Sequence, residues 1–317
     1  MPENEASART EQARRGGMSE PDKRLILYYQ THFAAKNGEE TVVSPRELVR
    51  NGAGVTDINL GAIHLNNLDD DQERNKPLTI NDTAPEDPRF QPVWDDLELI
   101  RGQVGIHAFV GGDAPGTFTR LERDFQRYYP LLRDFVIQYR MSGVDLDIER
   151  EGKEMADPTG TVGRVIDALR EDFPETFTIS LAPGAKELTQ DEGGLSGVRY
   201  RELYRTHGAK ITRFHAQFYC GWGDMSSKDG YLGVVDKSGI PTDKIVAGVV
   251  THNKHCGDYI KLNELREVIR DLRWECPDFA GVFGWEYHLS GGSEPDPKYQ
   301  DAPWMWAKEV SEVLRET

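Results

Sequence analysis

The sequence predicts an α/β protein whose main part is one (β/α)8 barrel, and three observations carry this prediction. From residue 24 onward, eight short runs rich in β-branched or aromatic residues alternate with segments of helical periodicity. The 317-residue chain has room for one barrel of about 250 residues with extensions. No break in composition divides the chain after residue 24. A doubly wound sheet is the alternative, but eight successive strand–helix units favour the closed barrel.

The eight expected strands share a high content of Val, Ile, Leu and aromatic residues. In chain order they span residues 25–32, 55–65, 104–110, 143–149, 177–181, 211–219, 245–250 and 281–287. Apolar spacing near i, i+3, i+4 predicts a long helix over residues 117–140, and further helices are expected at residues 162–172, 197–207, 262–275 and 304–314. The last helix would close the barrel. The acidic, proline-containing segment 66–95 is expected to be a long loop over the site.

The barrel is expected to comprise residues 24–317, preceded by a disordered leader over residues 1–23. The leader is rich in Glu, Arg, Ser and Gly and lacks the apolar stretch of a secretory signal. A cytoplasmic location is therefore the default expectation, with secretion by another route left open. No segment has the roughly 20 apolar residues that a membrane span needs.

The charge and cysteine content limit the partners and the redox chemistry. With 54 acidic and 38 basic residues, the chain has a formal net charge of −16, which disfavours nucleic acid and anionic membranes and leaves a neutral or cationic ligand. We expect a monomer.

The odd, sparse set of Cys220, Cys256 and Cys276 predicts free thiols rather than a disulfide framework. Cys220 is expected to be a packed thiol, reactive only if a cleft exposes it.

Residues 142–149, Ser-Gly-Val-Asp-Leu-Asp-Ile-Glu, place three carboxylates at alternate positions of a predicted strand. Asp145, Asp147 and Glu149 therefore share one face, and the apolar residues between them share the other. Taken alone, such a triplet indicates an exposed edge strand with a solvated acidic face. If helices cover the apolar face, the acids point into a barrel, where crowding raises at least one carboxyl pKa and creates a general acid.

Other expected strands contribute residues suited to binding a sugar. Active sites of such barrels lie at the C-terminal ends of the strands, and there the sequence places Gln217, Tyr219 and Trp285 beside the acids. Tyr28, on the first strand, is a further candidate for the binding surface. Aromatic faces stack on the apolar face of a pyranose, while carboxylates and hydroxyls address its polar groups, so glycoside chemistry is expected.

These motifs resemble those of glycoside hydrolase family 18, the chitinases and endo-β-N-acetylglucosaminidases, over most of residues 24–317. The family signature D-x-x-D-x-D-x-E is similar to residues 142–149, with Ser142 in place of the first acid. The family's S-x-G-G is similar to Phe109-Val110-Gly111-Gly112, its Q-F-Y to Gln217-Phe218-Tyr219, and its strand-eight tryptophan to Trp285. The length and the Q-F-Y form resemble the single-barrel branch of plant class III and fungal chitinases, without an inserted α+β subdomain.

The resemblance implies a retaining, substrate-assisted mechanism in which Glu149 protonates the glycosidic oxygen and the substrate's own acetamide attacks. Asp147 would orient the acetamide, Asp145 would share a proton with Asp147, and Tyr219 would hold the acetamide carbonyl; the three titrations are coupled. No cofactor is implied. The implied substrate-binding residues are Gln217, Trp285, Tyr28, Gly111, Gly112 and Trp222. For Trp222, stacking on a sugar and packing under a loop are equally supported.

The expected substrate is chitin or chito-oligosaccharides, cut at β-1,4 bonds next to N-acetylglucosamine. Cleavage of the chitobiose core of N-glycans is the alternative, because it shares the mechanism and differs in the loops outside the central subsite. A chitinase-like lectin that binds sugar without cutting it is a third possibility, disfavoured because Glu149 is present. Activity is expected to survive Ser142, since the missing first acid lies outside the Asp145–Glu149 core.

Three remaining features receive simpler interpretations. His252, His255 and Cys256 are expected to lie in a surface loop rather than a zinc site, because no further ligand pair has zinc-like spacing. Gly111 and Gly112 indicate a tight turn after a strand, since no nucleotide-binding motif follows. No metal is expected. Core or helix packing is the expected role of four tryptophans in helical patterns: Trp94, Trp274, Trp304 and Trp306.

Overall fold

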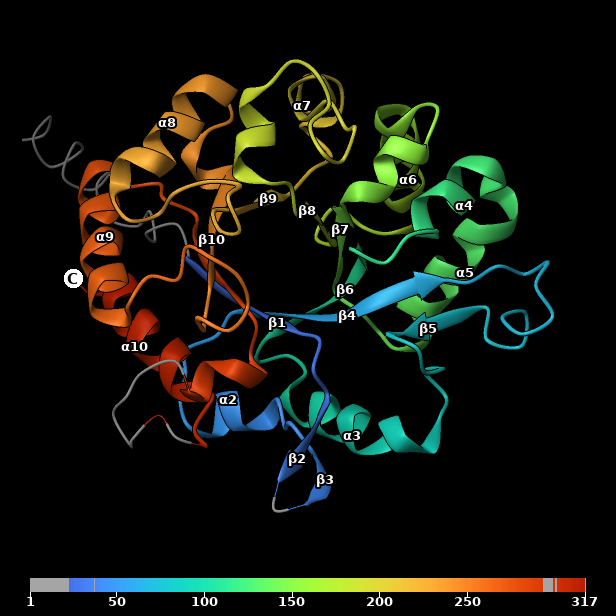
Figure 1. Ribbon diagram of the computed structural model, residues 1–317, viewed down its shortest axis with the longest axis horizontal. Coiled ribbons are helices and arrows are strands. Elements are labelled where there is room, and N and C mark those ends of the chain that lie inside the picture. The colour runs from blue at the N-terminus through green and yellow to red at the C-terminus, as the bar shows by residue number, and fades with distance from the viewer. Residues whose placement is uncertain (1–22, 37, 293–298, 300, 317) are drawn as a thin grey trace, which may run out of the picture.

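The computed structural model describes residues 23–36, 38–292, 299 and 301–316, and a closed barrel of parallel strands forms its centre (Figure 1). Its eight strands are β1 (Arg24–Tyr29), β4 (Asp57–Leu65), β6 (Gly105–Gly112), β7 (Gly143–Ile148), β8 (Thr178–Leu181), β9 (Arg213–Gln217), β10 (Ile245–Val250) and β11 (Gly281–Trp285). Each strand pairs with its neighbours in chain order, and β1 closes the barrel by pairing with both β4 and β11. The predicted (β/α)8 fold is confirmed. Apart from Lys23, the predicted leader lies outside the described residues.

Helices surround the strands as a ring (Figure 1). They are α2 (Arg46–Arg50), α3 (Gln91–Ile100), α4 (Thr117–Arg123), α5 (Phe125–Gln138), α6 (Pro158–Asp172), α7 (Tyr200–His207), α8 (Lys228–Ser238), α9 (Leu262–Glu275) and α10 (Trp304–Leu314). Short 3-10 helices are η1 (Pro88–Phe90), η2 (Arg150–Glu154), η3 (Ala185–Thr189), η4 (Thr242–Lys244) and η5 (His288–Gly292). No helix in the described part of the chain is long and apolar enough to cross a membrane.

The core has two parts, which follow from the alternation of strand side chains. One cluster lies between strands and helices and includes Val144, Leu146 and Ile148 of β7. A second, smaller cluster includes Tyr28 and Phe109 from β1 and β6, and it lies on the inner side of the barrel. The apolar face of β7 is thus covered, as the barrel interpretation required, and its acidic face points inward.

The predicted helix over residues 117–140 is interrupted, which corrects the sequence interpretation. The backbone of Asp124 is not helical (φ −148°, ψ 76°) and separates α4 from α5. Its N–H donates to the Arg120 carbonyl and ends α4, while its carbonyl accepts from the N–H groups of Arg127 and Tyr128 and begins α5. Asp is favoured at such a junction because it competes well for backbone groups at helix starts.

The prediction of one long loop over residues 66–95 is also wrong in part. This segment contains β5 (Leu78–Ile80), which pairs antiparallel with β4, then η1 and the first turn of α3. The hairpin of β2 (Phe33–Lys36) and β3 (Glu39–Val42) was missed too, and it projects from the ring in Figure 1. These strands have three or four residues, too few to give a clear period in the sequence.

The four helical tryptophans do not share one environment. Trp306 is buried at 1% exposure, and Trp94 and Trp304 pack against the core with part of their surface exposed. Trp274 is 90% exposed, so the prediction of core packing is wrong for it. The buried stripe of α9 runs through Leu265, Ile269 and Leu272, and Trp274 lies off that stripe.

Candidate active site

The acids of β7 reach the C-terminal mouth of the barrel through its interior. Asp145 is fully buried, Asp147 is 4% exposed, and Glu149 follows the last residue of the strand. Asp145 stands in register with Phe109 on β6 and with Ser180 on β8. The three carboxylates therefore rise in one line from the barrel interior to its mouth.

A cavity of about 320 Å³ opens above these acids, and every predicted site residue except Asp145 lines it. They are Tyr28, Gly111, Gly112, Asp147, Glu149, Gln217, Tyr219, Trp222 and Trp285. The sequence interpretation missed further lining residues, namely Gln30, Ala62, His64, Asp113, Ala114, Arg150, Ala182 and Leu195. Several of these directly follow a strand, and that position is the signal that could have identified them. No residue of segment 66–95 lines the cavity.

Three donors surround the Asp145 carboxylate. Oδ2 accepts from the Tyr28 hydroxyl at 2.5 Å, and Oδ1 accepts from Ser180 Oγ at 2.6 Å and lies 2.9 Å from His215 Nδ1. Burial opposes ionisation, but His215 and the hydrogen bonds outweigh it and lower the pKa of Asp145 below its usual value. Asp145 is therefore an anion at neutral pH.

The pKa of Asp147 is shifted in the opposite direction. Burial, reinforced by the negative charges of Glu149 and Asp145, raises the pKa of Asp147 well above its usual value. Gln217 Nε2 donates to Asp147 Oδ1 at 3.3 Å and to the Ala182 carbonyl at 2.8 Å. Asp147 therefore takes up a proton more readily than Asp145, and the contact with Gln217 helps to orient its carboxyl group.

Glu149 has the properties of a general acid. Burial and the neighbouring Asp113 raise the pKa of Glu149 to about 7, although Arg150 acts in the other direction. A carboxyl group that titrates near neutrality can both give up and regain a proton at the working pH.

Aromatic side chains form the remaining walls of the cavity. Burial and the adjacent acids raise the pKa of Tyr219 well above its usual value, so it keeps its hydroxyl proton. The Trp285 ring meets those of Tyr28 and Phe109 edge-on, with centroid distances of 5.5 and 5.9 Å. Trp222 lines the cavity and also packs over a neighbouring loop, because its ring lies against Gly184.

Two glycines at the end of β6 allow this strand to lie close to the acidic strand. Gly111 and Gly112 have φ values of +102° and +86°, which side chains of L-residues rarely permit. A Cβ on Gly111 would lie 2.2 Å from the Asp147 carbonyl oxygen. The pair forms the last residues of β6 rather than a turn after it.

The two departures from the family motifs lie at different depths. Ser142 precedes β7, and its Oγ accepts from the Ile106 N–H at 2.8 Å, away from the cavity. Phe109 lies beside the acids and fills space between Tyr28 and Trp285. The second departure is therefore the one that changes the surroundings of Asp145.

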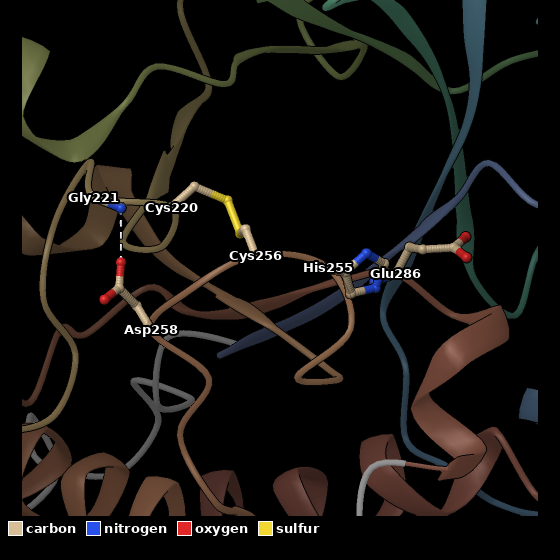
Figure 2. Close-up of a disulfide and its surroundings, with 6 residues drawn as sticks. All are labelled: Cys220, Gly221, His255, Cys256, Asp258 and Glu286. Atoms are coloured by element: carbon tan, nitrogen blue, oxygen red, sulfur yellow. Dashed lines mark hydrogen bonds between the residues drawn. A yellow bond between two sulfur atoms is a disulfide. The ribbon is translucent and has the colours of Figure 1, made fainter.

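The expectation of free thiols is wrong for two of the three cysteines. Cys220 and Cys256 form a disulfide with 5.4 Å between their Cα atoms, and Cys276 remains free. They are 36 residues apart in sequence, but each follows one of two neighbouring strands, β9 and β10, so their loops meet (Figure 2). The Gly221 N–H also donates to Asp258 Oδ2 at 2.7 Å and joins the same two loops.

The histidines of the second loop are less exposed than predicted. His252 is buried, and its Nδ1 accepts from the Lys254 N–H at 2.9 Å. Burial lowers the pKa of His255 to about 4, so the neutral ring accepts from the Glu286 N–H at 3.3 Å. Its ring also faces Trp285 at 6.3 Å. Within the described ranges, no three His, Cys, Asp or Glu side chains are grouped as a metal site.

Comparison with known proteins identifies the family. No protein-family model matches the sequence, and a comparison with curated proteins gives no match either. Among solved structures, the chain is similar to a fungal endo-β-N-acetylglucosaminidase from glycosyl hydrolase family 18, with a TM-score of 0.79 and 32% identity over 92% of this chain and 98% of that one. It is also similar to a chitinase from Aspergillus fumigatus, with a TM-score of 0.76 and 34% identity over 92% and 100% of the two chains. Because both similarities extend over nearly whole chains, this protein belongs to glycoside hydrolase family 18.

Proposed function

We propose that this glycoside hydrolase is a retaining, substrate-assisted endo-enzyme that cuts β-1,4 bonds at N-acetylglucosamine in chitin or chito-oligosaccharides. The division of protons among the acids of β7 carries the proposal. Asp145 has a lowered pKa, Asp147 has a pKa raised well above normal, and Glu149 has a pKa of about 7. A protonated Asp147 is a poor nucleophile, which leaves that part to the acetamide of the substrate.

In the proposed reaction, Glu149 gives its proton to the glycosidic oxygen as the bond from C1 to that oxygen breaks. The acetamide carbonyl oxygen attacks C1 and forms a cyclic oxazolinium ion. Asp147 orients the acetamide, and the Asp145–Asp147 pair stabilises its positive charge. The ionised Glu149 then takes a proton from water, which attacks C1 and restores the acetamide with retained configuration.

The residues that line the cavity support the proposed binding of an N-acetylglucosamine substrate. Trp285 offers an aromatic face for the sugar ring, and the Tyr219 hydroxyl is available to the acetamide carbonyl. Trp222 at the mouth supports a neighbouring sugar site.

Cleavage of the N-glycan core is the second candidate, because one of the two similar structures is an endo-β-N-acetylglucosaminidase. The fungal endo-β-N-acetylglucosaminidase and the Aspergillus chitinase resemble this chain almost equally, with TM-scores of 0.79 and 0.76. The resemblance implies the same central acids for both activities. The choice therefore depends on the loops around the cavity rather than on β7.

The deciding experiment is mass spectrometry of products from chitohexaose and from a high-mannose glycopeptide, each incubated with the wild type and with Glu149→Gln. We expect shortened chito-oligosaccharides from the wild type only. Glycan release that leaves one N-acetylglucosamine on the peptide would establish the second candidate instead. Binding of chitohexaose without cleavage of either substrate would establish a lectin.

A control substrate tests the mechanism separately from the specificity. Cellotriose has the same type of linkage but carries a hydroxyl in place of the 2-acetamido group. We expect no hydrolysis of cellotriose, because the internal nucleophile is missing. Efficient cleavage would contradict the substrate-assisted route, whatever the result with chitohexaose.

A further inference from the structure

A buried histidine lies beneath the catalytic acids and has no role in the mechanism described so far. His215, on β9, is fully buried in the barrel interior. Its Nδ1 lies 2.9 Å from Asp145 Oδ1 and 3.3 Å from both the Tyr28 hydroxyl and Asn59 Nδ2. Thus His215 contacts the innermost carboxylate of the site although it does not line the cavity.

The surroundings of the ring determine which nitrogen carries the proton. An ionised carboxylate only accepts hydrogen bonds, so the short contact with Asp145 requires a proton on Nδ1. The longer approach of Asn59 Nδ2, at 3.3 Å, is then a contact between two donors and not a hydrogen bond. The other nitrogen, Nε2, is buried and meets no hydrogen-bond partner among the described residues. A buried polar atom without a partner lowers stability. An apolar residue would avoid that loss, which indicates that the Nδ1 donor is the reason for a histidine here.

The neighbouring strands explain why Asp145 needs a donor from β9. On the β8 side, Ser180 is in register with Asp145 and donates to it. On the β6 side the residue in register is Phe109, which has no donor, where the family motif has serine. His215 reaches across from the next strand beyond β8 and supplies the missing hydrogen bond.

We propose that His215 is a positioning residue: its Nδ1–H holds Asp145 in place as an anion, so that the proton of the Asp145–Asp147 pair stays on Asp147. This inference rests on the proposed substrate-assisted function. With an ionised Asp145 beneath it, Asp147 presents its protonated side to the substrate, and the pair keeps one negative charge to oppose the oxazolinium ion.

The other ionisable groups near His215 do not compete for this role. Tyr28 stays neutral because burial raises its pKa well above normal, and Asp145 and Asp147 raise it further. Burial lowers the pKa of His107, on β6, to about 4, so it is neutral as well. Asp57 and Arg213 lie beyond His107, toward the other end of the barrel. Phe283 of β11 packs against the ring with 5.8 Å between centroids.

His215→Leu and His215→Asn test the inference in pH profiles of kcat and KM on the substrate that the wild type cuts. Leucine removes the Nδ1–H donor. The loss of a hydrogen bond to a charged group changes an equilibrium or a rate by about tenfold or more. We expect kcat to fall by about that factor while KM changes by less than about threefold. The acidic limb of the kcat profile of His215→Leu should move to higher pH, because Asp145 takes up a proton more readily without this donor. Asparagine can place an amide N–H near the Nδ1 position and should restore most of kcat.

His107→Leu is the matched control, since His107 is also a buried barrel histidine but contacts Asn59 and Asp57 rather than Asp145. It should leave the acidic limb in place. An unchanged kcat and acidic limb in His215→Leu, or the same shift in both leucine variants, would overturn the inference. A wild type that cuts neither substrate would instead reject the proposed function.

Nitrogen-15 NMR of the wild type tests the hydrogen bond without any variant or substrate. We expect His215 to be protonated at Nδ1, with its proton shifted downfield by the contact with Asp145. A His215 ring protonated only at Nε2 would overturn the inference even if every variant failed to fold.

Discussion

Two charges of opposite sign act on Glu149, and this allows its pKa to be moved in both directions. Asp113 raises the pKa of Glu149 and Arg150 lowers it, in addition to the larger effect of burial. Asp113→Asn should lower that pKa and move the alkaline limb of kcat/KM to lower pH, because Glu149 must hold a proton to act. Arg150→Met should move the limb to higher pH.

The size of these shifts is limited by solvent. The Arg150 and Asp113 side chains are 71% and 61% exposed and form an ion pair at 3.2 Å, so each shift should stay below about one pH unit and shrink at high salt. The measurement is kcat/KM against pH at low and high ionic strength. If the alkaline limb moved in the same direction in both variants, Asp113 and Arg150 would not control the pKa of Glu149.

Asp147 and Ser142 belong to the same motif but should respond very differently to substitution. Asp147→Asn should lower turnover by about a hundredfold or more, because an amide N–H is a much weaker hydrogen-bond donor than a carboxyl O–H and stabilises the reacting acetamide less well. Ser142→Ala should leave turnover within about twofold and cost about 1 kcal/mol of unfolding free energy, the value of its hydrogen bonds to Ile106. Turnover assays and urea titrations of both variants, run in parallel, test these two expectations. Equal losses of turnover would contradict the expected difference between Asp147 and Ser142.

At the scale of single residues, much of the site could be predicted from the sequence. The alternation of acids over residues 143–149 was enough to place Asp145, Asp147 and Glu149 on one inner face. His215 was not predicted, because nothing in residues 211–219 distinguishes it from other buried strand residues. Its contact with Asp145 depends on the relative position of β7 and β9, which are separated by β8, and no local pattern contains that information.

At the scale of single elements, the close contact of β6 with β7 depends on Gly111. A Cβ there would lie 2.2 Å from a backbone oxygen at a φ of +102°, so Gly111→Ala must push the strands apart at the level of Asp147. We expect a loss of more than about 2 kcal/mol in unfolding free energy and a large loss of turnover.

Gly102 is the matched control for that change. It also has a positive φ, +84°, but a Cβ there would meet nothing within 4 Å. Gly102→Ala should cost only the conformational strain of about 1 kcal/mol and leave turnover unchanged. If both alanine variants lost the same stability in urea titrations, the strand contact at Gly111 would be unimportant.

The Cys220–Cys256 disulfide joins the loops after β9 and β10 (Figure 2). Cys220 directly follows Tyr219 and lines the same cavity as Trp285. Cys220→Ser or Cys256→Ser should lower the unfolding free energy by about 2–4 kcal/mol, since the bond closes a loop of 36 residues. The loops also position His255 against Trp285, so KM should rise more than kcat falls.

Cys276→Ser should match the wild type in stability and kinetics, because Cys276 is a free thiol. A thiol reductant should destabilise the wild type and Cys276→Ser equally, and it should leave the other two serine variants unaffected. Thermal melts with and without reductant give the comparison. A wild type that does not respond to reductant would contradict the disulfide.

The strands of the barrel could be predicted from the sequence, but the disulfide between two of their loops could not. All eight barrel strands were predicted because each forms a compact β-branched or aromatic run. The cysteines were judged by number and sparseness, whereas their pairing follows from the adjacency of β9 and β10. Likewise α2 and α8 were not predicted, and α3 was indicated only by the helical pattern around Trp94. The helical periodicity over residues 117–140 did not reveal the interruption at Asp124.

At the scale of the whole molecule, the barrel depends on the joint where β1 pairs with both β4 and β11. Helix α10 packs beside this joint and contacts α9, α2 and β1. Its Trp306 is buried and lies against Gly284 of β11, where a Cβ would be 2.7 Å from the ring. The last helix thus packs at the closure of the barrel, where its position in the sequence placed it.

Trp306 and Trp274 lie on neighbouring helices and allow the contribution of this joint to be measured. Trp306→Ala should lower the unfolding free energy by about 3–5 kcal/mol, because it removes a large buried side chain from a position that a small residue cannot fill. Trp274→Ala, at a position 90% exposed, should change it by less than about 0.5 kcal/mol. Urea titrations followed by circular dichroism at equal protein concentration measure both. Equal losses would mean that α10 does not stabilise the closed barrel through Trp306, and a loss only in Trp274→Ala would indicate that the exposed tryptophan is covered in solution.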